Sequence, residues 1–183
     1  DAFVSHFSST GTLLSSTYLG GGGNDGGSAL AGDGAGGVWV MGWTTSTDFP
    51  VLNAYQSTYG GEYSDAFVSH FSSTGTLLSS TYLGGERDES DGYGHTLAGD
   101  GAGGVWVAGI TWSSDFPILK AYQNSHGGGD WDAFVSHLSS TGVLLSSTYL
   151  GGENREAGFA LAGDGAGGVW VTGSTGSSNF PVL

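Results

Sequence analysis

The stretch LAGDGAGGVWV occurs three times without change, at residues 30–40, 97–107 and 161–171. Identical copies of this length indicate that one structural unit recurs along the chain. Inside the stretch, Asp-Gly and Gly-Gly pairs provide the positive φ angles that tight hairpin turns need. The flanks contain Leu, Val and Trp, which favour β-strands, so we expect each copy to form a β-hairpin.

The composition favours short strands and excludes several classes of partner. The 183 residues include 37 Gly and only 3 Pro, and Ser, Thr, Val, Leu and aromatic residues make up most of the remainder. The 17 acidic and 3 basic residues give a net charge of −14, so contacts with phosphates of nucleic acids or anionic membranes are disfavoured. There is no cysteine, and no apolar run approaches a membrane span. We therefore expect an all-β protein with no nucleic-acid partner and no membrane insertion.

Two further blocks recur in a fixed order with the first. DAFVSH begins at Asp1, Asp65 and Asp132, and LLSSTYLGG follows it in each copy. We therefore divide the single region 1–183 into repeat 1 (1–64), repeat 2 (65–131) and a truncated repeat 3 (132–183). The loop after LLSSTYLGG differs between copies, at 22–28, 86–95 and 153–159, and variable loops on a fixed scaffold are a common place for binding sites.

Each repeat predicts two hairpins joined by that variable loop. Residues 3–7 and 13–19 form the first hairpin, and residues 29–31 and 38–44 form the second, because β-rich runs alternate with Ser/Gly turns. A long connection then runs from Asp48-Phe49-Pro50 to the next DAFVSH block.

The order DAFV, STYLGG, VWV followed by Gly, and then DFP with AYQ resembles the SBBP repeat, a bacterial β-propeller repeat of secreted and surface proteins. The resemblance covers essentially the whole chain, although His6, His70 and His137 stand where a basic residue is expected. It implies four-stranded antiparallel blades around an axis, with residues 29–33 innermost, then 38–44, 65–72 and 77–83 outermost. It also implies an extracellular or cell-surface location.

On this assignment the two ends of the chain are complementary halves of a blade. The N-terminal hairpin 1–20 supplies two outer strands, and the C-terminal hairpin 160–175 supplies two inner strands. Three blades are too few to close a ring, since propellers have about four to eight. We expect a homodimer in which a second chain completes six blades, with a filament or a fragment of one longer chain as the alternatives.

The repeats contain one candidate metal site and a less regular acidic insert. Asp33, Asp100 and Asp164 follow the innermost strand, so a ring of carboxylates could bind Ca²⁺. The alternative is that Asp before Gly serves only the turn, which we favour. The acidic residues of the middle loop predict a solvated charged loop rather than a cation site. They are Glu86, Asp88, Glu89 and Asp91.

The aromatic residues fall into repeated and unrepeated sets. Trp39, Trp106 and Trp170 lie between valines and are expected in the packing between blades. Trp43, Trp112 and Trp131 do not repeat, and such aromatic residues could bind a glycan or cover the ends of blades. The histidine of each DAFVSH block predicts a structural or pH-sensitive surface role, not a catalytic one.

No catalytic constellation emerges from the sequence. The favoured function is a non-catalytic structural or adhesive module of a secreted or surface protein, because identical repeats suit a scaffold whose output is shape and multivalency. A glycan- or calcium-binding propeller is the second hypothesis, and a fragment of a larger propeller enzyme is the third. We expect no cofactor unless Ca²⁺ is bound.

Overall fold

The computed structural model describes residues 1–89 and 94–182, and within these ranges every regular element is a β-strand. Their bounds are Ala2–Phe7 (β1), Leu13–Leu19 (β2), Asp25–Gly32 (β3), Val38–Thr44 (β4), Asp65–Phe71 (β5), Leu77–Leu83 (β6), Thr96–Gly99 (β7), Val105–Thr111 (β8), Asp132–Leu138 (β9), Leu144–Leu150 (β10), Glu156–Gly163 (β11) and Val169–Thr175 (β12).

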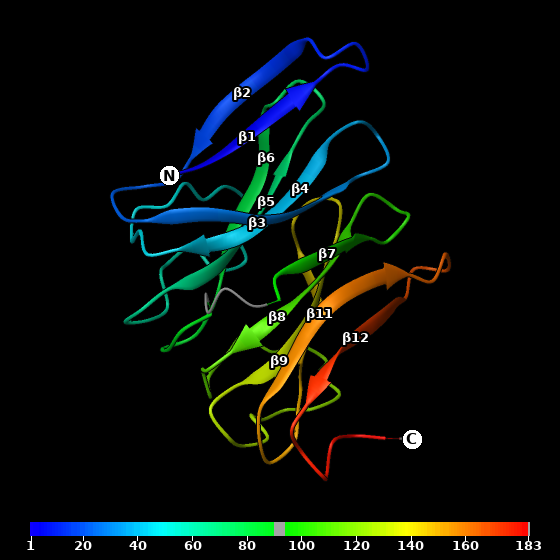
Figure 1. Cartoon of the computed structure of the whole chain (residues 1–183). Coiled ribbons are helices and arrows are strands. Elements are labelled where there is room, and N and C mark those ends of the chain that lie inside the picture. The colour runs from blue at the N-terminus through cyan, green and yellow to red at the C-terminus, as the bar shows by residue number, and fades with distance from the viewer. Residues whose placement is uncertain (90–93, 183) are drawn as a thin grey trace.

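The strands form four antiparallel sheets (Figure 1). Two sheets have four strands, in the orders β3-β4-β5-β6 and β7-β8-β9-β10, and two are isolated hairpins, β1-β2 and β11-β12. The strand order within a complete sheet is the one expected for a blade. The sheets do not close into a ring within one chain, and the two isolated hairpins lie at opposite ends of the molecule.

The central contact of each complete sheet joins hairpins from two successive repeats. β4 pairs with β5 along its whole length, with Trp39 opposite His70 and Met41 opposite Val68. β8 pairs with β9 in the same register, with Trp106 opposite His137. A complete sheet therefore takes its inner hairpin from one repeat and its outer hairpin from the next.

The innermost strand begins earlier than predicted. β3 starts at Asp25, inside the segment 22–28 that the sequence predicts as a loop, and β11 likewise starts at Glu156. The sequence pattern does not indicate this extension in β3, because Gly26 and Gly27 have low β-propensity. A bulge between Gly27 and Ala29 follows the first three pairs with β4. The side chain of Asp25 explains the early start, because it bonds hydroxyl groups at the far end of β4.

Both faces of the complete sheets are packed. Trp39, Met41 and Val68 contribute to a core shared with the sheet β7–β10. Val40 and Phe67, on the other face of the sheet β3–β6, belong to a core shared with the hairpin β1-β2. Alternating residues of one strand thus enter two different cores, which is the pattern of a sheet stacked between two others.

The long connection covers the outer edge of each complete sheet. Leu52 forms a bridge with Ser80 of β6, and Gln56 forms one with Tyr82. Leu119 and Gln123 do the same for β10. A covered edge does not recruit other chains, so within the described residues the outer edges of the two complete sheets are closed, whereas β1 and β12, the counterparts of their central strands, each have one unpaired edge.

Gly42 allows β3, β4 and β5 to pack closely. A Cβ at this position would lie 2.0 Å from the Gly26 carbonyl oxygen and 2.7 Å from the Phe67 ring. We expect Gly42→Ala to destabilise the chain by about 1–3 kcal/mol, the usual cost of overpacking. Urea unfolding followed by tryptophan fluorescence measures this difference. Gly32→Ala is the matched control, because a Cβ there meets no atom within 4 Å; equal effects of the two changes would contradict this account.

Candidate functional site

The edges of β1 and β12 are the least complete surfaces of the molecule. Each would be a central strand in a four-stranded sheet, but within the described residues each pairs on one side only. The side chains show the consequence, because Trp39 in β4 is 0% exposed whereas Trp170 in β12 is 73% exposed. Phe67 in β5 is 0% exposed whereas its counterpart Phe3 in β1 is 73% exposed.

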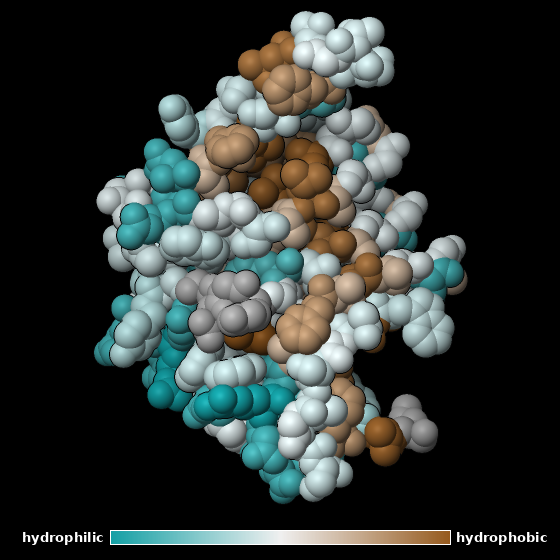
Figure 2. Space-filling model, viewed as in Figure 1, coloured by the Kyte–Doolittle hydropathy of each residue, from teal (hydrophilic) through white to brown (hydrophobic). Residues whose placement is uncertain are grey.

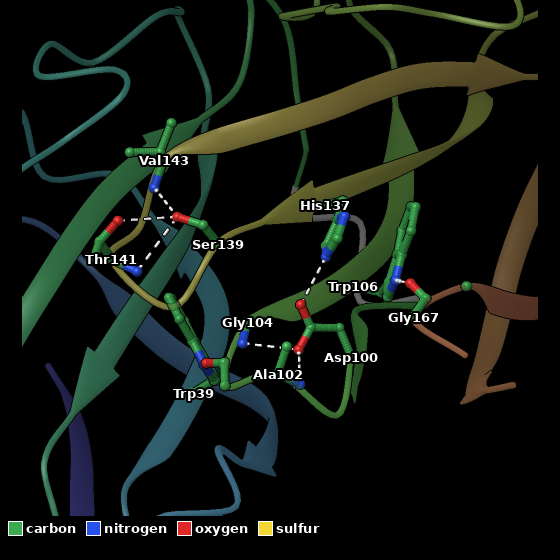
Figure 3. A network of polar contacts seen from close by, with 12 residues as sticks. Trp39, Asp100, Ala102, Gly104, Trp106, His137, Ser139, Thr141, Val143 and Gly167 are labelled. Carbon is green, nitrogen blue, oxygen red and sulfur yellow. Dashed lines mark hydrogen bonds and ion pairs between the residues drawn. The ribbon is translucent and has the colours of Figure 1, made fainter. Parts of the chain in front are cut away.

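In the complete sheets, the central pair of strands carries a cluster of His, Asp and Trp (Figure 3). His137 Nε2 donates to Asp100 Oδ2 at 3.0 Å, and the His137 ring stacks on Trp106 with centroids 4.1 Å apart. His70, Asp33 and Trp39 repeat this arrangement at the same distances. The counterparts of these residues in the open hairpins are His6 on β1, Trp170 on β12 and Asp164 in the turn between β11 and β12.

The same tryptophans connect each sheet to the next. Trp39 Nε1 donates to the Gly103 carbonyl oxygen at 3.0 Å, and Trp106 Nε1 donates to that of Gly167 at 3.0 Å. Both acceptors lie in the Asp-Gly turn of the following sheet, as Figure 3 shows for Trp106 and Gly167. Gly36 is the glycine equivalent to Gly103 and Gly167. By the same pattern, its carbonyl oxygen would accept from the tryptophan indole of a sheet stacked before β3–β6, at the position that Trp170 has in β12.

A second repeated contact joins the outer strand to the long connection. The Tyr82 hydroxyl donates to the Ser46 carbonyl oxygen at 2.7 Å and accepts from the Phe49 N–H at 2.9 Å. Tyr149 makes the equivalent bonds with Ser113 and Phe116. These two tyrosines are each 1% exposed, whereas Tyr18, in the open hairpin β1-β2, is 80% exposed.

A groove lies beside each open hairpin. The larger one, of about 560 Å³, runs between β1 and β3 and is lined by Phe3, Phe7 and Leu30 among others. Figure 2 shows hydrophobic side chains gathered in this region, below the β1-β2 hairpin. The other groove, of about 210 Å³, follows β12 and is lined by Val171, Phe180 and residues of β9 and β10.

These grooves correspond to positions that strands fill elsewhere. β11 packs against β7, β8 and β9 of the preceding sheet. β3 is the counterpart of β11. Of the strands that would correspond to β7, β8 and β9, only the counterpart of β9, which is β1, packs against β3 within the described residues. The groove between β1 and β3 therefore has the place, and the apolar lining, of a missing inner hairpin.

The three aspartates considered as a candidate calcium ring make the turn contacts that the sequence analysis favoured for them. Asp33 Oδ1 accepts from the N–H groups of Ala35 and Gly37 at 2.7 and 2.8 Å, and Asp100 and Asp164 accept equivalent bonds. Burial alone would raise the pKa of Asp33, but the bonds from His70 and these N–H groups hold it below 3.8. In the part of the chain that the structure describes, no group of three or more His, Cys, Asp or Glu side chains is placed to hold a metal ion.

Sequence reasoning missed a repeated buried carboxylate. Asp25, Glu89 and Glu156 occupy one equivalent position, and each accepts hydrogen bonds from a Thr and a Ser hydroxyl of the neighbouring strand and its following turn. Glu89 is 0% exposed, so its assignment to a solvated loop is wrong. Of the other insert residues, Glu86 is exposed, Asp88 bonds Ser64, and Asp91 lies outside the described residues. An acidic residue that follows each LGG block by a fixed interval was the available signal.

Asp65 lies next to Glu89 with one oxygen unpaired. Asp65 Oδ2 accepts from the Gly60 N–H at 2.8 Å, whereas Oδ1 is buried without a partner. A Cβ on Gly84 would lie 2.7 Å from Asp65 Oδ1 and 2.5 Å from Glu89 Oε2, so both carboxylates point toward this glycine. Burial raises the pKa of Asp65 to about 7 and that of Glu89 to about 8. Burial also raises the pKa of Asp132 in the next repeat.

The three predicted ligand-binding tryptophans separate into a pair and a single residue. Trp112 and Trp131 contact each other, with ring centroids 4.8 Å apart, and the Arg155 guanidinium lies 4.4 Å from the Trp131 centroid. Trp43 instead lies over Gly26 within its own sheet. Of the repeated tryptophans, Trp170 is not in a core, because no third strand covers β12.

Comparison with protein-family models gives no match to this chain, and comparison with curated proteins gives none either. The resemblance to the SBBP repeat therefore stays a prediction that depends on the blocks quoted above. Among the described residues, no helix is long and apolar enough to cross a membrane.

The buried carboxylates predict that stability falls as pH rises. Asp65 binds its proton more tightly in the folded chain, where its pKa is about 7, than in the unfolded chain, where it is 3.8. The folded state therefore holds more protons between these values, and its free energy of unfolding decreases with pH. We expect a loss of about 1 kcal/mol per pH unit between pH 5 and 7, measured by urea unfolding.

Asp65→Asn should reduce this pH dependence, because it removes one titrating group and its repulsion of Glu89. Glu62→Gln changes an exposed carboxylate and should leave the slope as it is. A slope that is flat in the unmodified chain, or the same in Asp65→Asn, would show that these carboxyls titrate normally.

Proposed function

We propose that this chain is a non-catalytic structural or adhesive module that assembles with a second copy into a six-bladed β-propeller. The observation that carries the proposal is that the open edges of β1 and β12 expose residues whose counterparts are buried in the complete sheets. Unpaired strand edges recruit another chain unless they are covered. The hairpin β1-β2 of one copy would complete the sheet begun by β11-β12 of the other.

The register of the proposed contact follows from the complete sheets. By equivalence with β4-β5 and β8-β9, Trp170 would face His6 of the second copy, and Thr172 would face its Val4. His6 would then reach Asp164, and Trp170 would donate to Gly36 in the turn of the next blade. Each contact copies one that a complete sheet already makes, so no new type of interface is needed.

A twofold arrangement uses the open edges of both β1 and β12. Each chain has one β1 edge and one β12 edge, and reciprocal pairing of two copies leaves neither open. One alternative is that each copy pairs its remaining open edge with a third copy, which gives a filament. The other is that the chain is a fragment of one longer chain that supplies the remaining blades. The repeat resemblance and the lack of a catalytic constellation favour a secreted or cell-surface scaffold over an enzyme.

Cysteine cross-linking tests both the contact and its closure. The chain has no native cysteine, so Val4→Cys combined with Thr172→Cys places the only thiols at the predicted facing positions. Facing residues of paired strands have the Cα separation that a disulfide needs. On oxidation we expect a covalent dimer on a non-reducing gel, and native mass spectrometry of the unmodified chain should give twice the mass of one chain.

Val4→Cys combined with Val171→Cys is the control, because a shift of one residue places the two side chains on opposite faces. A ladder of covalent oligomers on the gel would show that the chains form a filament and not a closed ring. A chain that stays monomeric at high micromolar concentration and does not cross-link would overturn the proposal.

Tyr18 gives an independent prediction. In an assembled blade its hydroxyl would bond the Ser177 carbonyl oxygen and the Phe180 N–H of the second copy, as Tyr82 and Tyr149 bond their counterparts. Tyr18→Phe removes these bonds at two symmetric contacts, so we expect dimer dissociation to become about tenfold easier or more. Analytical ultracentrifugation measures the change. Tyr122→Phe, at another exposed tyrosine, should leave the dissociation constant unchanged.

A further inference from the structure

A small pocket lies between the two complete sheets, away from the open edges. It has a volume of about 220 Å³ and is lined by Tyr63, Arg87, Asp88 and Trp112. Tyr63 and Arg87 are exposed, and Trp112 and Asp88 are half-buried. Two aromatic side chains and an oppositely charged pair therefore meet at one opening, which is the composition of a ligand site.

The next junction along the chain has the equivalent pocket without the aromatic residues. It is lined by Gly129, Asp130, Asn154, Arg155 and Gly176, and it is wider, at about 480 Å³. In the repeat alignment, Tyr63 corresponds to Asp130, Arg87 to Asn154 and Trp112 to Gly176. Repeats that share entire blocks thus differ at each of these three positions, so the aromatic pocket is particular to one junction.

Trp112 packs against neighbouring residues that do not line the pocket. Trp131, whose counterpart in the preceding repeat is Ser64, packs against it at 4.8 Å, and Arg155 packs on Trp131. The backbone N–H of Trp112 donates to the Asp88 carbonyl oxygen at 3.1 Å, which couples this wall of the pocket to the loop that carries Arg87. A supported aromatic wall binds a flat apolar surface with little loss of side-chain entropy.

The charges of the pocket select against ionic ligands. Arg87 disfavours a cation at the opening, although aromatic walls alone would suit a quaternary ammonium group. Asp88, with Glu62 and Glu86 nearby and a net charge of −14 on the chain, disfavours an anion. A guanidinium and a carboxylate that line the same pocket offer both donors and acceptors, which suits a ligand rich in hydroxyl groups.

We propose that this pocket binds one neutral sugar ring of a carbohydrate, with Trp112 against the C–H face of the ring and Arg87 and Asp88 bonding its hydroxyl groups. Tyr63 forms the facing wall. The site uses no residue of β1 or β12, so it is independent of the proposed assembly. It would give the dimer two sugar sites and hence multivalent attachment.

Saturation-transfer NMR on the full chain tests the site with methyl glycosides of glucose, galactose, mannose, fucose and N-acetylglucosamine. We expect transfer to the ring C–H protons of at least one of them, with affinity reduced tenfold or more in Trp112→Thr and in Arg87→Asn. Both substitutions introduce the residue that another repeat carries at that position, so the fold is retained. Asn154→Gly, at the equivalent pocket, is the matched control and should bind as the unmodified chain does.

Tetramethylammonium and methyl glucuronide (as its carboxylate) are the competing probes. Binding of either probe in preference to every neutral glycoside overturns the proposal. The proposal is also overturned if Trp112→Thr binds the glycosides as well as the unmodified chain does, or if no neutral glycoside shows saturation transfer. Native mass spectrometry of each variant reports the assembly separately, so loss of the sugar site and loss of the dimer are distinguished.

Discussion

The pairing of β4 with β5, and of β8 with β9, is the contact on which the rest of this structure depends. It joins two hairpins that belong to different sequence repeats and that are separated by the long connection. The structural unit is therefore offset from the sequence repeat by half a sheet. Because of this offset, three copies of the repeat give two complete sheets and two halves, and the open edges of β1 and β12 follow directly.

The stretch LAGDGAGGVWV stabilises this pairing and also its own turn and the contact with the next sheet. Its Asp closes the turn with Oδ1 and anchors the histidine of the next hairpin with Oδ2, as Asp33 does with His70. Its Trp stacks on the same histidine and donates to the turn of the following sheet. In the first two copies, one short block thus fixes the inner hairpin, its contact with the outer hairpin and its contact with the neighbouring sheet.

The sequence predicts strands near 38–44, 65–72 and 77–83, because apolar blocks between Gly-rich turns are local signals. Their order in the sheet is implied only by the resemblance to the SBBP repeat, and the structure has the same order. The sequence does not predict that β3 begins at Asp25, since Gly26 and Gly27 have low β-propensity and the stabilising partners, Thr44 and Ser46, are distant in sequence. Glu89 was misplaced for the same reason: its burial depends on hydroxyl groups supplied by Thr111 and Ser113. The meeting of Trp112 with Trp131 also needs three-dimensional placement, because neither residue repeats.

In the proposed assembly, pairing between chains would copy the contacts that identical blocks make within a chain. What distinguishes the two kinds of pairing is the long connection, which brings β5 to β4 and then covers the outer edge of β6 through Leu52 and Gln56. A hairpin that arrives from a second copy lacks this tether and must pay the entropy of association. Two half-sheets closing at once reduce that cost, since the second contact forms within an already joined pair. In the proposed assembly, a closed dimer would therefore be favoured over a filament wherever the angle between neighbouring sheets allows the ring to close.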